Sequence, residues 1–507
     1  MSSFVRFGAL AGALGVTLFT ASAATSRRSL QDHDVVIDKE LLITAVEVVD
    51  SPLATYPGPW SFGHLMDEAY GAEKAPAMVA QWLESWAEGK LPGNSGVSIE
   101  GREGLRKLLI EPWQKADGYQ PGEKEGEDGW LPNLANAPFQ LLAIANRMDL
   151  SVPLASFNDP KSIPLPAGPA YYGSPGGFDS AGGEGRLVFA ATDQEGNPLS
   201  PGVTLILEYG LDIAREQDRF LDWAMAWHEL GLHESHDATY RASLAKVTRA
   251  FTDRREVNDT KNPDRPVFKP EQLRKLSLID RLTSMTTNMP IQLMRIRTND
   301  GAFGKVREFR EFRWTARGFD AAPLAGTPRE IFFRKGTMEN RWMARWLRVQ
   351  GTEKVTATTA RDDPQNEIPN SFVLPSSVRV RGKMEPVVAH IAPVPGNSAA
   401  YHWDGWGTRR QGLRRAFSTQ TCCGCHCGDT NTEFFHIGPR IRGEETKLSK
   451  FLRTDGTRWR AVDPKTRRSF LSAEMELRKE LFEAALKPDL RSRKIKALKE
   501  SRQEAAD

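Results

Sequence analysis

Hydrophobic residues recur at helical spacing in several stretches of the chain. Within residues 75–87, Met78, Trp82 and Trp86 follow one another every four residues and so share one face of a predicted helix. Residues 138–150 form an apolar run that predicts a buried helix. The same reasoning predicts further helices at residues 105–113, 211–230, 237–251, 409–420 and 473–501.

Other stretches carry the signals of β-strands. Residues 35–49 are rich in β-branched side chains and predict one long strand or a pair of strands. Residues 291–298 and 306–314 lie on either side of Asn299-Asp300-Gly301 and predict a hairpin. Further strands are predicted at residues 186–191, 203–209, 372–374 and 378–381.

These elements follow no regular alternation of strand and helix, and no internal repeat is visible, so the sequence predicts an α+β fold. A mixed body of helices and strands would precede a mostly helical, cytochrome c-like C-terminal unit. Polar, turn-rich stretches at residues 157–185 and 351–370 separate parts of the chain. The predicted regions are a leader (1–23), a mainly helical N-terminal region (24–156), a mixed region (157–399) and a C-terminal unit with a basic helix (400–507).

The first residues have the pattern of a secretory signal peptide. Arg6 precedes an apolar run rich in small residues, and Ala21-Ser22-Ala23 matches the small-x-small pattern of a cleavage site. The alternative is a single uncleaved anchor helix, for which the run is short. We therefore expect cleavage near Ala23 and a periplasmic or secreted protein.

Composition narrows the functional classes. The chain has 507 residues and a formal net charge of +3, which is too balanced for a general nucleic-acid or membrane-surface binder. After the leader, no apolar run is long enough for a membrane span, so stable membrane insertion is not expected. The excess of Lys and Arg after residue 440 would suit an acidic redox partner, although a solvated helix explains it equally.

All four cysteines lie within six residues, in the segment TCCGCHCG. Cys422, Cys425 and His426 satisfy the Cys-x-x-Cys-His pattern of covalent c-type haem attachment. Two thiols one helical turn apart can both add to the haem vinyl groups, and the next residue supplies the imidazole for the iron. The sequence therefore predicts an exported c-type haem protein that serves in electron transfer or haem-based oxidoreduction.

Two alternatives stay open for this cluster. Cysteine and histidine at this spacing could instead hold zinc, as Cys₃His or Cys₄. In an oxidising compartment the thiols could form local disulfides, although such short loops would add little stability. Either alternative describes an exported binding or structural module. The haem pattern assigns no role to Cys423 or Cys427, whereas the zinc alternative could use Cys427 together with Cys422 and Cys425.

The same segment, RRAFSTQTCCGCHCGDTNTEFFHIGPR, resembles the C-terminal part of a group of uncharacterised exported bacterial proteins. Those proteins share a Phe, then Cys-x-x-Cys-His, an acidic-Thr segment, Phe-x-His and a Pro-Arg pair. The upstream segments WSFGHLM (60–66), LLAIANRMDL (141–150), GEGRLVF (183–189) and LMRIRTNDG (293–301) are also similar to that group. The resemblance implies a shared organisation but no activity. Cys423 and Cys427 depart from the group's usual segment, which favours the metal or disulfide alternative.

If haem is bound, His426 would ligate the iron and a second ligand is needed on the opposite face, or that face is open. His436 lies ten residues on, in Phe434-Phe435-His436, and Met475 is a weaker candidate. Arginines near the motif could pair with haem propionates or simply form a solvated face; they are Arg409, Arg410, Arg414, Arg415 and Arg440.

Other constellations carry less chemistry. His228 and His233 are five residues apart with Glu229 between them, whereas the zincin motif needs a spacing of four on one helix face. The glutamates at 208, 308 and 311 have no spacing that pairs them as acid and base. The motifs therefore assign no enzymatic reaction.

The leader generates a direct prediction. N-terminal sequencing of the exported protein should begin just after Ala23, because the apolar run ends at the predicted cleavage site. An exported protein that begins at Met1 would show that the run is an anchor.

Overall fold

A computed structural model describes most of the chain between residues 34 and 486. The described residues are 34–89, 100–119, 129–150, 183–210, 217–253, 293–315, 318–324, 326–352, 374–375, 377–394, 417–418, 421–426, 430, 432–453, 459–462, 469–472 and 474–486. The predicted leader, most of the predicted helix at 409–420 and Cys427 lie outside these residues.

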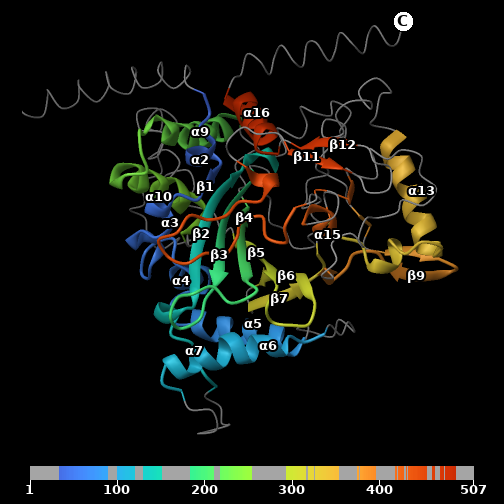
Figure 1. The fold of residues 1–507 in the computed structure, drawn as a ribbon, viewed down its shortest axis with the longest axis horizontal. Helices are drawn as coiled ribbons and strands as arrows, with labels where there is room; N and C mark the ends of the chain where they lie inside the picture. The colour runs from blue at the N-terminus through green and yellow to red at the C-terminus, as the bar shows by residue number, and fades with distance from the viewer. Residues whose placement is uncertain are drawn as a thin grey trace, which may run out of the picture.

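An eight-stranded antiparallel sheet forms the centre of the structure (Figure 1). Its strand order is β1-β2-β3-β4-β5-β6-β10, and β7 also pairs with β6. The strands are β1 (Leu42–Ile43), β2 (Phe139–Arg147), β3 (Glu184–Ala191), β4 (Val203–Gly210), β5 (Leu293–Asp300), β6 (Arg307–Thr315), β7 (Gly318–Ala322) and β10 (Ile391–Val394). Two small hairpins pair β8 (Ser377–Val380) with β9 (Lys383–Pro386), and β11 (Trp459–Val462) with β12 (Ser469–Ser472).

Helices complete a mixed α+β fold, which confirms the predicted class. The longer ones are α4 (Phe62–Tyr70), α5 (Ala75–Glu88), α9 (Gln217–His228), α10 (Ala238–Thr252), α13 (Met338–Thr352) and α16 (Glu474–Leu486). Shorter ones are α2 (Ile37–Glu40), α3 (Val46–Val49), α6 (Glu103–Leu105), α7 (Glu111–Ala116) and α15 (Cys422–Cys425), with a π-helical turn at Arg106–Ile110 between α6 and α7. Short 3₁₀ turns are η1 (Pro52–Ala54), η3 (Leu134–Asn136), η4 (Met148–Leu150), η6 (Glu229–Leu232), η7 (Glu330–Phe332) and η10 (Lys450–Leu452).

One face of the sheet, here called the helix face, packs against α4, α5 and α10. Aromatic rings dominate this contact: Trp82 and Trp86 of α5 both pack against Phe312 of β6. Phe251 of α10 lies against Tyr209 of β4 and directly over Gly185, where a Cβ would collide with its ring. Buried aromatic area of this kind supplies much of the free energy of folding.

Most predicted elements are confirmed, but two are wrong. The predicted helix at 138–150 is the strand β2 followed by η4, and the predicted strand region at 35–49 contains α2, the two-residue β1 and α3. A strand covered on both faces shows no alternation of apolar and polar residues, and β2 is such a strand, with Leu141–Ala145 all buried. The central sheet also joins two of the predicted regions, because β1 and β2 come from residues 24–156 whereas its other strands come from residues 157–399.

The opposite face of the sheet, here called the charged face, lies under residues from the C-terminal part of the chain. Residues 432–453, which we call the strap, run across the strands in Figure 1 as an orange-red trace. Phe435 and Pro439 of the strap lie over Gly202, beside β4. Arg440 then reaches Asp50, directly after α3, through two hydrogen bonds of 2.7 and 2.9 Å.

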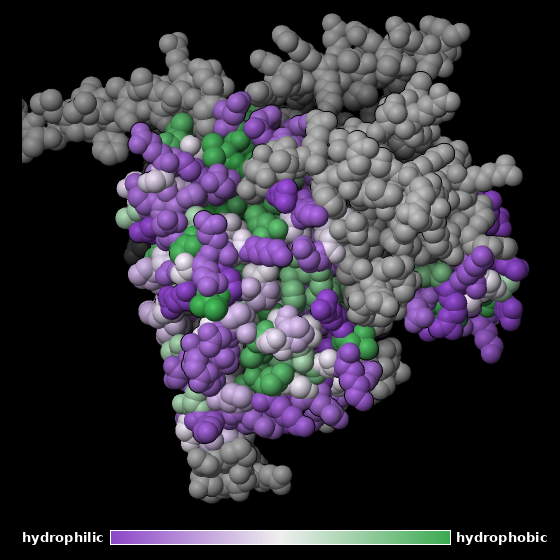
Figure 2. Space-filling model, viewed as in Figure 1, coloured by the Kyte–Doolittle hydropathy of each residue, from purple (hydrophilic) through white to green (hydrophobic). Residues whose placement is uncertain are grey.

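Polar residues prevail on the face of the described residues that Figure 2 draws. Figure 2 shows hydrophilic residues over most of the visible face, with hydrophobic residues in small separate patches. Within the described residues, no helix combines the length and the apolar character that crossing a membrane requires.

The Asp50–Arg440 pair should hold the strap to the body. The side chains are 11% and 2% exposed. Burial by itself would raise the pKa of Asp50, but hydrogen bonds from Arg440 and from the Gly443 N–H lower it overall. Asp50→Asn keeps the shape and leaves Arg440 buried without its counter-charge, so the free energy of unfolding in urea should fall by about 2–3 kcal/mol.

Glu433→Gln is the matched control for this substitution. Glu433 pairs with Lys447 within the same strap at 3.5 Å, but both side chains are exposed, so its loss should change stability by less than about 1 kcal/mol. Equal effects of the two substitutions would contradict the anchoring role of Asp50.

Candidate metal centre

The cysteine segment forms the single helical turn α15. Thr421 caps it: the Thr421 hydroxyl accepts a hydrogen bond from the Gly424 N–H at 3.1 Å. Gly424 packs against the backbone of Ser418, where any Cβ would collide with the Ser418 carbonyl oxygen. This turn places Cys422 and Cys425 one turn apart and delivers His426 directly after the helix.

Three of the predicted site residues meet at one point. The Cys425 Sγ lies 3.2 Å from the His436 Nε2, and the rings of His426 and His436 have centroids 4.0 Å apart. One ligand atom from each of Cys425, His426 and His436 lies within 4.8 Å of the other two. Among the described residues, no other group of three or more His, Cys, Asp or Glu side chains is arranged so that it could hold one metal ion.

Aromatic rings enclose the two imidazoles. Phe309 of β6 packs against His426 with ring centroids 4.7 Å apart, and Phe451 of η10 stacks on His436 at 4.9 Å. Phe434 in turn packs against Phe309 at 5.0 Å. The two histidines therefore touch each other inside a continuous series of rings.

Each imidazole has a defined partner at Nδ1. The Nδ1 of His426 lies 2.8 Å from the Phe434 carbonyl oxygen, and the Nδ1 of His436 lies 2.8 Å from the Ser449 hydroxyl. A carbonyl oxygen only accepts hydrogen bonds, so His426 carries its proton on Nδ1 and keeps the Nε2 lone pair for a ligand. This is the usual arrangement of a metal-binding histidine.

Burial sets the protonation of the three residues. Burial lowers the pKa of His426 to about 4 and that of His436 well below its ordinary range, where the neighbouring His426 also contributes. Burial raises the pKa of the Cys425 thiol to about 12, with Glu474 adding to the effect. The imidazoles are therefore neutral near pH 7, and the thiol keeps its proton until a cation replaces it.

The remaining predicted residues lie elsewhere. The Cys422 sulfur accepts a hydrogen bond from the Thr327 hydroxyl at 3.3 Å, and Cys423 is buried beside Phe309 and Phe434. Met475 belongs to the main hydrophobic core. Arg440 pairs with Asp50, while the other four candidate arginines lie outside the described residues.

Among the described residues, the histidines at the end of α9 and just beyond it belong to no group of three metal-ligating side chains. His228 is buried and its Nδ1 lies 2.8 Å from Glu40, whereas the His236 Nε2 lies 3.3 Å from the Asp38 carbonyl oxygen.

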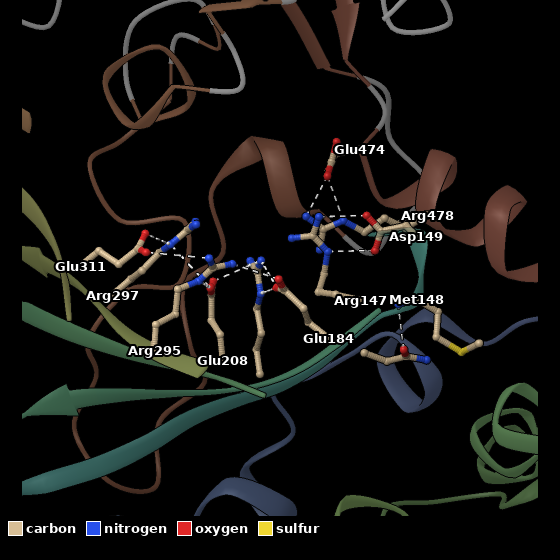
Figure 3. Close-up of polar contacts among 12 residues, drawn as sticks. Arg147, Met148, Asp149, Glu184, Glu208, Arg295, Arg297, Glu311, Glu474 and Arg478 are labelled. Carbon is tan, nitrogen blue, oxygen red and sulfur yellow. Dashed lines mark hydrogen bonds and ion pairs between the residues drawn. The ribbon is translucent and has the colours of Figure 1, made fainter. Parts of the chain in front are cut away.

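Beneath the centre, the charged face of the sheet carries a ladder of alternating ionic side chains (Figure 3). Its carboxylates are Glu184, Glu208 and Glu311, each at most 1% exposed. Arginines from the same and neighbouring strands separate them. Apart from the closer contact between Arg295 and Glu208, the N–O distances lie between 2.6 and 3.8 Å. These arginines are Arg186, Arg295, Arg297 and Arg313. Register explains the order, because Arg186, Glu208 and Arg295 are directly paired across β3, β4 and β5.

The ladder continues to α16. Arg147 pairs with Asp149 at 2.8 Å, and Arg478 of α16 pairs with Glu474 at 2.7 Å beside them (Figure 3). Two arginines of this series also affect the pKa values of the metal-centre histidines. Arg297 lowers the pKa of His426, and Arg478 lowers that of His436, in each case after the larger effect of burial. The sequence analysis missed this ladder, although Arg295 and Arg297 alternate with apolar residues in one strand.

Comparisons with known proteins do not identify the chain. No family model, no curated protein and no solved structure matches it.

Glu208 is the best point at which to test the ladder. Burial would raise its pKa, but Arg186, Arg295 and Arg297 hold it well below its ordinary range. Glu208→Gln would leave buried guanidinium groups undercompensated, so the free energy of unfolding should fall by about 3–5 kcal/mol in urea denaturation. Glu195→Gln, in the exposed turn after β3, makes the same chemical change and should have little effect. A small loss for both variants would show that the ladder is not needed for stability.

Proposed function

We propose that this chain is an exported metal-binding protein in which Cys425, His426 and His436 hold one transition-metal ion, with zinc as the best fit. The observation that carries the proposal is the convergence of one sulfur and two imidazole nitrogens within 4.8 Å. Export rests on the leader pattern before Ala24.

The spacing suits a small ion. Zn–S bonds are about 2.3 Å and Zn–N bonds about 2.0–2.1 Å, so ligand atoms around a tetrahedral zinc lie roughly 3.3–3.6 Å apart. The 3.2 Å between the Cys425 sulfur and the His436 nitrogen is close to that range. A mixed set of thiolate and imidazole is also typical of zinc sites.

A structural role follows from where the ligands lie. Cys425 and His426 belong to α15 and its end, whereas His436 belongs to the strap, so one ion would join two segments that cover the charged face. When bound, the ion supplies coordination bonds that favour the folded state. The protein's own residues orient the ligands: Phe309 packs against His426, Phe451 stacks on His436, and Phe434 packs against Phe309.

Covalent haem is the second candidate. Cys422, Cys425 and His426 keep the attachment spacing, and the hydrogen bond from His426 Nδ1 to the Phe434 carbonyl would suit an iron ligand. Against it, two iron ligands on opposite faces of a haem have the macrocycle between them, whereas the rings of His426 and His436 are in contact at 4.0 Å. The packing therefore favours a small ion over a macrocycle at this point.

Metal analysis tests the proposal directly. Full-length protein, produced in cells that can mature c-type cytochromes and purified without chelators, should contain about one zinc ion per chain. Cys425→Ser and His436→Ala should each lose most of it, because each removes one of three ligands. His233→Ala, which changes a half-buried histidine outside the centre, should retain it.

The same preparation distinguishes haem from zinc. Pigment that stays with the polypeptide after extraction with acidic organic solvent, and that disappears in Cys422→Ser, would replace the zinc proposal with the haem one. Protein with neither bound metal nor pigment would contradict both.

A further inference from the structure

We propose that Ser449 is a positioning residue of this metal centre: its hydroxyl holds the His436 imidazole by Nδ1, so that Nε2 faces the ion. This inference rests on the proposed function. Ser449 lies outside the cysteine motif and 13 residues beyond His436, so no spacing rule points to it.

The hydrogen bond is short, buried and geometrically specific. The Ser449 Oγ lies 2.8 Å from the His436 Nδ1, and Ser449 is 1% exposed. On the other side of the ring, the His436 Nε2 points to the Cys425 sulfur at 3.2 Å. When Nε2 gives its lone pair to a metal, the ring proton must be on Nδ1, and the Ser449 oxygen accepts it.

The Ser449 hydroxyl also does not cap the turn that follows it. Ser449 occupies the N-cap position of η10, where a serine side chain commonly accepts a hydrogen bond from the first turn. Here the side chain makes no such bond and is turned to His436 instead. The turn is closed by the backbone alone, with the Leu452 N–H donating to the Ser449 carbonyl oxygen at 3.0 Å.

The strap brings the two residues together as a small hairpin. The Ser449 N–H donates to the His436 carbonyl oxygen at 2.9 Å, and Ile437 and Leu448 form an isolated antiparallel bridge. Phe451, two residues beyond Ser449, stacks on the same imidazole. The ring is thus fixed by a hydrogen bond at its edge and by an aromatic face, before any ion binds.

The test measures zinc affinity by competition with a chelator. Because partners of metal-bound histidines typically contribute 10–100-fold to affinity, Ser449→Ala should weaken Zn²⁺ binding by about that factor. Ser449→Thr and Ser449→Val form a pair of nearly equal shape, of which only Thr keeps the hydroxyl. The Thr variant should therefore bind at least about tenfold more tightly than the Val variant. The Co²⁺-substituted Ala and Val variants should also show altered ligand-field spectra.

Ser61→Ala controls for a general loss of stability. Ser61 is similarly buried and caps α4 far from the centre, so its loss should lower the melting temperature without changing zinc affinity. Zinc affinity that is unchanged in Ser449→Ala, or equal in the Thr and Val variants, would overturn the role of Ser449 while leaving the metal centre intact. Wild-type protein that takes up no zinc would overturn the centre itself.

Discussion

The way in which the C-terminal residues cover the sheet depends on three carboxylates that are buried on its charged face. Glu184, Glu208 and Glu311 have almost no contact with solvent, and burying charge without compensation would cost several kcal/mol for each group. Strand register supplies the compensation by placing an arginine beside each of them. Such a face packs poorly against an ordinary apolar helix, and the C-terminal segment that covers it brings its own polar groups, including Arg478 and the cysteine–histidine cluster.

Much of the secondary structure could be predicted from the sequence where each element has one buried side. The helix α5 shows Met78, Trp82 and Trp86 at the expected spacing, and β5 and β6 show the signals of a hairpin. The pattern failed at β2, because a central strand that is buried on both faces has the same composition as a buried helix. The pattern also failed at residues 35–49, where one long strand or a pair of strands was expected. Only Leu42 and Ile43 pair with the sheet there, and the short helices α2 and α3 lie on either side of them.

Part of the candidate site could be predicted from the sequence because its ligands are close together in the chain. Cys425, His426 and His436 lie within 12 residues of one another, and their residue types already suggest a ligand set. Ser449 and Thr327 carry no such signal, because their importance arises from where the strap and the residues after β7 meet the cluster. The ionic ladder depends on pairing between strands, and its central contact joins Arg295 to Glu208, 87 residues away in the sequence, which no local pattern reports.

The contact between the strap and Asp50 has a consequence for biogenesis. Arg440 and Asp50 are separated by 390 residues, and His426 packs on Phe309 of a strand formed much earlier in the chain. A ribosome must therefore complete nearly the whole polypeptide before these partners can meet. A protein truncated before residue 432 would lack the whole strap, so Asp50 would lose Arg440 and the charged face of the sheet would lose the cover that Phe435 and Pro439 provide.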